Sequence, residues 1–168
     1  MALLEETKAI LADLVAFPTI SADSNLDMIA YLEARLSGLG ARTERTHDKS
    51  GKKANLFATL GPEGDGGIVL SGHTDVVPVA DQGWSSDPFA LSERDGLLFG
   101  RGTCDMKGFI AAALAVAPVF ARTDLRCPLH FAFTYDEETG CLGAPVLVEA
   151  LRRRGLRPAV AIIGEPTG

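Results

Sequence analysis

Apolar residues recur at helical spacing in the first part of the chain. Residues 2–17 carry Ile10, Leu11 and Leu14 in register and stop before Pro18, which predicts a helix. Residues 25–39 carry a second apolar stripe and are followed by Gly40, a typical helix stop. Residues 107–120 are apolar on nearly all sides and predict a buried helix, and residues 143–154 predict a fourth helix.

Short apolar runs between these helices predict strands over 41–46, 55–60, 67–72, 129–135 and 159–163. The Gly- and Asp-rich stretch 61–67 predicts a hairpin turn between two of them, and residues 91–99 predict a second hairpin that turns at Asp95-Gly96. Helices that alternate with apolar strands are typical of an α/β fold. We therefore expect one domain, with a mixed, largely parallel sheet flanked by helices.

Composition narrows the function classes. The 168 residues have a formal net charge of -6, which argues against a nucleic-acid partner, since that requires clustered excess Lys and Arg. No apolar run reaches the ~18–20 residues that span a bilayer, and Glu5 and Glu6 interrupt the N-terminal apolar stretch, so we expect neither a membrane segment nor a signal peptide. Three cysteines without a C-x-x-C pair favour free thiols and a cytoplasmic location.

Residues of the metal-ligand type follow four predicted strands. In open α/β sheets, ligands bind beyond the carboxyl ends of the strands. At these four exits the sequence has His73 and Asp75; Asp105; Glu137 and Glu138; and Glu165. Five acidic side chains at one edge would repel one another and raise some of their pKa values unless cations offset the charge. One imidazole with several carboxylates favours zinc or cobalt over magnesium or calcium.

Each of these residues also has a simpler explanation when it is taken alone. His73 could be a hydrogen-bonded structural histidine, and Asp105 could cap the following helix. The pair Glu137-Glu138 could lie in a solvated loop, and Glu165 could be a turn residue before Pro166. Their joint occurrence at strand exits, beside glycines, favours a metal site. Adjacent glutamates on extended backbone point opposite ways, so one could bind an ion while the other moves protons, but the pattern does not say which. Asp75 could hold the second nitrogen of the His73 imidazole.

Five motifs make the sequence recognisable: SGHTDVVPV (71–79), GWSSDPF (83–89), GRGTCDMKG (100–108), DEETG (136–140) and IIGEPT (162–167). In this order and spacing they resemble the dinuclear zinc deacylases, a family that includes acetylornithine deacetylases, succinyl-diaminopimelate desuccinylases, aminoacylases and related carboxypeptidases. The residues in and around these motifs are most similar to those of the acetylornithine deacetylases. The resemblance runs over nearly the whole chain and implies the catalytic-domain fold of zinc-dependent exopeptidases.

The resemblance also implies roles for individual residues. His73 and Glu165 would bind one zinc ion, Glu138 would bind the second, and Asp105 would bridge both beside a cis peptide to Met106. Glu137 would be the general acid/base, and Asp75 would orient His73. Co2+ is a possible substitute for Zn2+, and the substrate would be an N-acyl amino acid, with N-acetylornithine preferred.

Family members continue past this point with a lid and dimerisation domain and a last catalytic segment that supplies another histidine. We therefore expect residues 1–168 to be the N-terminal part of a catalytic domain, incomplete at its C-terminal side, in a protein that forms a homodimer when full-length. The chain by itself is expected to have weak or no activity, because His47 and His130 do not lie where they could replace the missing ligand. A desuccinylase, aminoacylase or dipeptidase is the alternative enzyme, and a non-catalytic metal-binding module is the alternative of another class.

Overall fold

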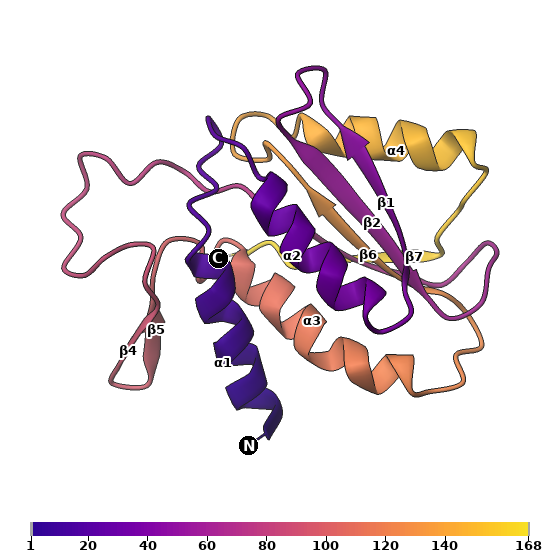
Figure 1. Cartoon of the computed structure of the whole chain (residues 1–168), viewed down its shortest axis with the longest axis horizontal. Coiled ribbons are helices and arrows are strands. Elements are labelled where there is room, and N and C mark those ends of the chain that lie inside the picture. Colours follow the sequence, from indigo (N-terminus) through magenta and orange to yellow (C-terminus); the bar gives the residue numbers. More distant parts are fainter. Residues whose placement is uncertain (1, 168) are drawn as a thin grey trace.

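A five-stranded mixed sheet organises residues 2–167, the part of the chain that the computed structural model describes (Figure 1). Its strand order is β1 (Arg42–His47), β2 (Ala54–Leu60), β6 (Leu129–Thr134), β3 (Ile68–His73) and β7 (Val160–Ile163). The strands β6, β3 and β7 are parallel, whereas β1 and β2 pair antiparallel and β2 joins β6 antiparallel. The predicted mixed α/β fold is confirmed.

Helices cover both faces of this sheet. On one face, α2 (Leu26–Ser37) packs against β1 and β2 and α3 (Lys107–Ala121) packs against β3, while α1 (Ala2–Val15) lies outside them against α3. The other face carries α4 (Gly143–Arg153) over β1, β2 and β6 (Figure 1). The larger apolar core lies on this side of the sheet, where buried residues of α1, α2 and α3 form one cluster with buried residues of β2 and β6.

The predicted turn at residues 61–67 is not a hairpin. β6 lies between β2 and β3 in the sheet, so the two strands that flank this stretch do not pair with each other. Gly61, Gly64, Gly66 and Gly67 do have left-handed backbones, as a turn requires, but the turn joins non-adjacent strands. Loop chemistry marks a reversal of the chain, and it does not reveal that a strand from later in the sequence inserts there.

The second predicted hairpin is confirmed but lies outside the main sheet. β4 (Ser92–Arg94) and β5 (Leu97–Phe99) form a separate two-stranded sheet, with left-handed backbones at Asp95 and Gly96. Residues 100–106 therefore do not follow a strand of the main sheet, and our expectation of four exits from one sheet is wrong for this segment. Asp105 reaches the edge of the main sheet because it lies two residues before α3, which packs on β3.

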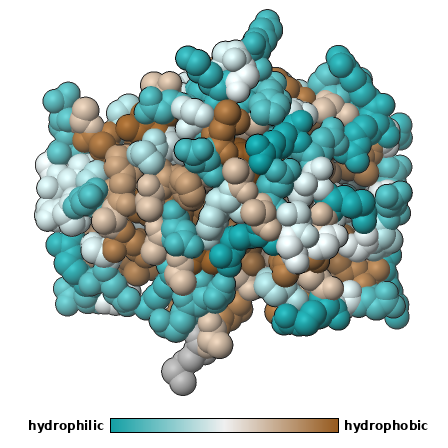
Figure 2. All heavy atoms as spheres, in the orientation of Figure 1, coloured by the Kyte–Doolittle hydropathy of each residue, from teal (hydrophilic) through white to brown (hydrophobic). Residues whose placement is uncertain are grey.

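One end of the sheet is poorly covered. Beyond α4, a hollow of about 360 Å³ lies over β3 and β7 and is lined mainly by apolar side chains. Every residue of the edge strand β7 is exposed, including Val160, Ile162 and Ile163. Apolar side chains also lie between hydrophilic ones on the face of the molecule seen in Figure 2.

Candidate metal centre

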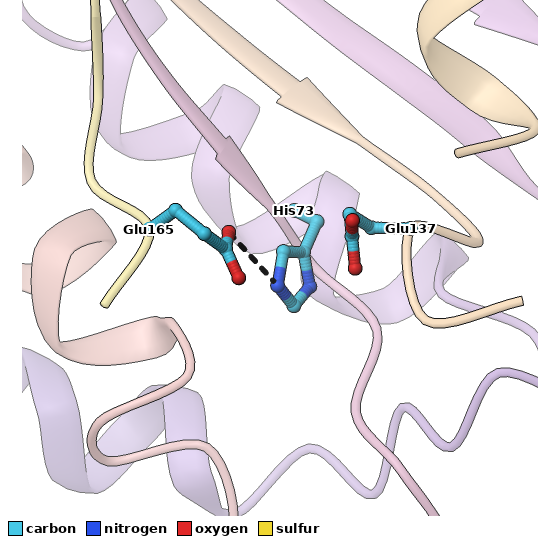
Figure 3. A group of neighbouring side chains, drawn as sticks. All are labelled: His73, Glu137 and Glu165. Carbon is cyan, nitrogen blue, oxygen red and sulfur yellow. Dashed lines mark ion pairs between the residues drawn. The ribbon is translucent and has the colours of Figure 1, made fainter. Parts of the chain in front are cut away.

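The three parallel strands end at one edge of the sheet and bring their following residues together. His73 is the last residue of β3, Glu137 and Glu138 lie in the turn after β6, and Glu165 follows β7. Figure 3 shows the His73 imidazole between the carboxylates of Glu165 and Glu137. The close approach of β7's exit to α3 requires a glycine, since a Cβ on Gly164 would lie 1.9 Å from the Phe109 ring.

Asp105 joins this cluster from the start of α3. Its Oδ1 lies 2.9 Å from His73 Nε2, and Glu165 Oε2 lies 3.7 Å from the same nitrogen. The peptide bond between Asp105 and Met106 is cis, as the resemblance implied. The helix cap is Met106 and no side chain caps this end, so Asp105 is free of the capping role that the sequence left open.

The possible ligand atoms form two groups that share His73. One group contains His73, Glu137 and Glu165, the other contains His73, Asp105 and Glu138, and within each group the ligand atoms lie within 4.8 Å of one another. The structure thus brings together all five residues to which we assigned metal binding or proton transfer. Which of them bind an ion and which moves protons remains a prediction.

Asp75, the sixth predicted site residue, contacts both the imidazole and the glutamate turn. His73 Nδ1 donates to the backbone carbonyl of Asp75 at 2.9 Å, while the Asp75 carboxylate is farther from this nitrogen, at 3.6 Å. Because a carbonyl oxygen can only accept, Nδ1 carries a proton, and Nε2 is the nitrogen that faces the carboxylates. The Asp75 carboxylate accepts from Ser21 Oγ at 2.6 Å and from the backbone N–H groups of Glu137 and Glu138 at 3.0 and 3.3 Å.

The pKa values show the accumulated negative charge. Burial alone would lower the pKa of His73, but the carboxylates of Asp75 and Asp105 outweigh it and raise that pKa to about 9. Burial raises the pKa of Glu138, and the neighbouring Asp105 carboxylate raises it further. Burial also raises the pKa of Glu165, and Asp105 adds to the shift. The protein alone therefore holds these carboxylates at a cost that a cation would remove.

The donor set fits a transition-metal ion. An imidazole nitrogen with carboxylate oxygens suits zinc or cobalt, whereas calcium and magnesium prefer all-oxygen sites. The other two histidines are elsewhere: His130 is buried in β6, stacked on Phe57 and hydrogen-bonded to Thr59, and His47 is exposed at the end of β1. His73 is thus the only imidazole that residues 2–167 contribute to the cluster.

Three contacts around the cluster were not predicted. Ser21 bonds to Asp75, Lys53 Nζ bonds to Asp136 at 2.6 and 2.7 Å, and the Cys141 thiol donates to Glu137 Oε1 at 3.2 Å. Ser21 and Lys53 stand outside the recognisable motifs, so no local signal in the sequence identifies them. Cys141 directly follows DEETG, and its distance from Glu137 along the chain was the one available hint.

Two expectations about the rest of the chain can be checked. Cys104, Cys127 and Cys141 are all free and exposed, as expected from their number and spacing. Among the described residues, every helix is too short or too polar to cross a bilayer.

Comparison with known proteins agrees with this site. The sequence profile of "Peptidase family M20/M25/M40" matches residues 69–168, more than half of the chain. The chain is 45% identical over 161 residues to acetylornithine deacetylase of Pasteurella multocida (strain Pm70), which covers 92% of this chain and 41% of that protein. Acetylornithine deacetylase of Shigella sonnei (strain Ss046) is 44% identical over the same shares. The chain therefore spans about two fifths of the length of these curated relatives.

Solved structures share the fold. Human carnosine dipeptidase 1 superposes with a TM-score of 0.84 at 27% identity, over 98% of this chain and 39% of that one. The M20 family metallo-carboxypeptidase Sso-CP2 of Sulfolobus solfataricus superposes with a TM-score of 0.81 at 22% identity, over 97% and 38%. The profile match, the identity to the curated relatives and the ligand cluster agree that this chain belongs to peptidase family M20/M25/M40.

Proposed function

We propose that this chain forms the metal-binding part of a zinc-dependent amidohydrolase that removes the acyl group from an N-acyl amino acid. The observation that carries the proposal is the convergence of one imidazole and four carboxylates on a common point at the sheet edge. The two groups of ligand atoms overlap at His73, whose free Nε2 can bind only one ion, so a second ion would be held by Asp105 and Glu138. The preferred substrate is N-acetylornithine, because the two relatives with 44–45% identity are acetylornithine deacetylases.

The residue roles follow the family pattern. His73 and Glu165 would hold one Zn2+, Glu138 the second, and Asp105 would bridge them, with Co2+ a possible substitute. Asp75 would act as a positioning residue, since it fixes the His73 ring through its carbonyl and the glutamate turn through its carboxylate. The pair of ions would polarise the acyl oxygen and lower the pKa of the attacking water.

Glu137 is the proposed general acid/base. Its carboxylate would take a proton from water as the water oxygen bonds to the acyl carbon, and would hand a proton to the amine nitrogen as the C–N bond breaks. Acetate and ornithine would be the products when the substrate is N-acetylornithine. Such proton transfer contributes about 10²–10⁴-fold to a rate. The Cys141 thiol, which donates to Glu137 Oε1, would help to hold that carboxylate in place.

The curated relatives are longer than this chain, and this difference in length leads to further proposals. Since the chain covers 41% of the Pasteurella protein, we propose that residues 1–168 are the N-terminal part of a catalytic domain. A lid and dimerisation domain and a last catalytic segment would complete the site in a full-length, homodimeric enzyme of arginine biosynthesis in the cytoplasm. The 168-residue chain alone is then expected to bind metal but to turn over substrate weakly or not at all.

A chimera tests the proposal. This chain replaces the matching segment of the Pasteurella multocida relative, and release of ornithine from N-acetylornithine is compared with hydrolysis of N-succinyl-diaminopimelate and of a dipeptide. Preferred turnover of one of the other two substrates would reassign the enzyme within the family. A folded chimera that binds zinc and hydrolyses none of the three would favour a non-catalytic module.

The chimera also tests the assignment of Glu137. Glu137→Gln should lower kcat about 10²–10⁴-fold and leave the zinc content unchanged, because the amide keeps the size of the side chain but cannot accept the proton. Glu63→Gln is the matched control, since Glu63 is exposed on the loop after β2. Equal loss of zinc and activity in Glu137→Gln would show that Glu137 is a ligand and that its role was misassigned.

A further inference from the structure

The turn that carries Glu137 and Glu138 has an unfavourable backbone at both ends. Asp136 has a φ of 55° and Cys141 has a φ of 56°, both in the left-handed region that residues other than glycine avoid. A turn of this kind keeps its shape only where surrounding contacts hold it. The direction of both glutamate side chains therefore depends on whatever fixes the backbone of residues 136–141.

One set of contacts reaches the turn from the segment after β3. The Asp75 carboxylate accepts from the backbone N–H groups of Glu137 and Glu138 and from Ser21 Oγ. Asp75 is only 2% exposed, so these bonds are protected from water and replace its lost hydration. The backbones of both glutamates are thereby tied to the same side chain.

A second set of contacts comes from Lys53, which directly precedes β2. Lys53 Nζ donates to both carboxylate oxygens of Asp136, at 2.6 and 2.7 Å, and to the backbone carbonyl of Ser21. The Lys53 and Asp136 side chains are only 16% and 10% exposed, which weakens solvent screening of the pair. The bonds close a ring that runs from Lys53 through Asp136 and the turn to Asp75, and returns through Ser21.

The ring also has a useful charge distribution. The Lys53 ammonium lies against the carboxylate of Asp136, the residue before the two glutamates. Its hydrogen bonds go to Asp136 and Ser21 rather than to the predicted ligands. It thus offsets one carboxylate next to the acidic cluster without occupying a ligand oxygen. A lysine in this place can control the geometry of the cluster while it touches neither ion nor substrate.

We propose that Lys53 is a positioning residue, which acts through Asp136 and Ser21 to hold Glu137 and Glu138 toward His73. This inference rests on the proposed function, in which Glu138 binds metal and Glu137 moves protons. Outer contacts of this kind typically change metal affinity about 10–100-fold when they are removed. Loss of the Lys53 ammonium should therefore weaken metal binding by a similar factor although no ligand has changed.

The test compares Lys53→Met with Lys52→Met in the 168-residue chain. Lys52 is the exposed neighbour, and its hydrogen bonds involve its backbone rather than its ammonium group. The control therefore makes the same charge change outside the ring. Hydrogen exchange of the Glu137 and Glu138 amides is followed by NMR without metal, and Co2+ binding is followed by visible absorption. We expect exchange at least about 10-fold faster and Co2+ affinity about 10–100-fold weaker in Lys53→Met, with a changed spectrum, and wild-type behaviour in Lys52→Met.

The two readouts separate this inference from the proposed function. If the wild-type chain binds neither Co2+ nor Zn2+, the proposed metal site is wrong, while the amide exchange still decides whether Lys53 holds the turn. Unchanged exchange in Lys53→Met would overturn the positioning role. If Lys53→Met does not fold, Asp136→Asn removes the same ion pair from its other side and keeps a residue that tolerates the left-handed backbone, and unchanged exchange in that variant would overturn the inference equally. Restored exchange and Co2+ spectrum in Lys53→Arg would support it, because that variant keeps the cation.

Discussion

Asn55 offers a direct measure of what holds the glutamate turn to the sheet. This residue of β2 is fully buried, and its side chain donates to Thr46 Oγ1 at 2.9 Å and to the Gly143 carbonyl at 3.0 Å. Its Oδ1 accepts from the backbone N–H of Tyr135 at 3.2 Å. Tyr135 and Gly143 flank the turn that contains Glu137, so Asn55 fastens both ends of it.

Replacement by leucine should remove all three bonds. Leucine has the same branched arrangement of side-chain heavy atoms as asparagine but no polar atom, so the buried Tyr135 N–H is left without its partner. Each ordinary lost bond costs about 0.5–1.5 kcal/mol, and an unpaired buried donor costs about 1–3 kcal/mol. We therefore expect Asn55→Leu to lower the free energy of unfolding by about 2–6 kcal/mol, a large part of the ~5–15 kcal/mol that stabilises a typical domain.

Urea unfolding followed by circular dichroism measures this difference. The control is Thr46→Ala, which removes one partner of Asn55 and leaves the bonds to Tyr135 and Gly143 in place, so a loss below about 1.5 kcal/mol is expected. A loss below 1.5 kcal/mol in Asn55→Leu as well would show that these three bonds do not hold the turn, and the reasoning would be refuted.

Three further outcomes can be measured on the same chain. Burial lowers the pKa of His130, so below pH ~6.5 this histidine becomes protonated in the unfolded chain more readily than in the folded chain. The free energy of unfolding should then decrease as the pH is lowered below this value, by up to about 1.4 kcal/mol per pH unit more than in His130→Gln. Urea unfolding at several pH values measures both slopes, and equal slopes in the two proteins would contradict this prediction. Gly164→Ala should lose about 1–3 kcal/mol and bind Zn2+ more weakly in calorimetry, because its Cβ overlaps the Phe109 ring, whereas Gly83→Ala, with no atom within 4 Å, should behave as wild type. The exposed apolar strand β7 should cause self-association that Val160→Lys reduces, and a monodisperse wild-type monomer by light scattering would count against it.

The sequence predicted the main elements of the fold because their patterns are strong and local. The run 107–120 is apolar on nearly every side, and the structure has a helix at Lys107–Ala121. The order of strands was not accessible in the same way. Whether β2 pairs with β3 or with β6 depends on which surfaces pack together, and residues 61–67 have the same turn chemistry in either case.

The candidate metal ligands could be predicted from residue types in the sequence, but the residues that hold these ligands in place could not. His73, Asp105, Glu138 and Glu165 belong to motifs in which the residue type itself indicates the role. Lys53 is an ordinary surface-type residue in the sequence, and only the fold places it against Asp136. The contact of His73 with the carbonyl of Asp75, rather than mainly with its carboxylate, likewise depends on backbone geometry that spacing alone cannot supply.

The arrangement of charge explains why the candidate ligands could be predicted from the sequence and the residues that position them, Lys53 and Ser21, could not. A cluster of carboxylates around His73 destabilises the chain in isolation, so its residue types make sense only together with a cation. Lys53 and Ser21 instead satisfy Asp136 and Asp75, two carboxylates that take no part in either group of ligand atoms. The protein thus gives the acids that shape the site partners of their own, whereas the acids that face its centre gather around one imidazole, that of His73. That division is what a metal-binding site requires, because the energy released when the ions bind comes from the charges that the fold itself does not satisfy.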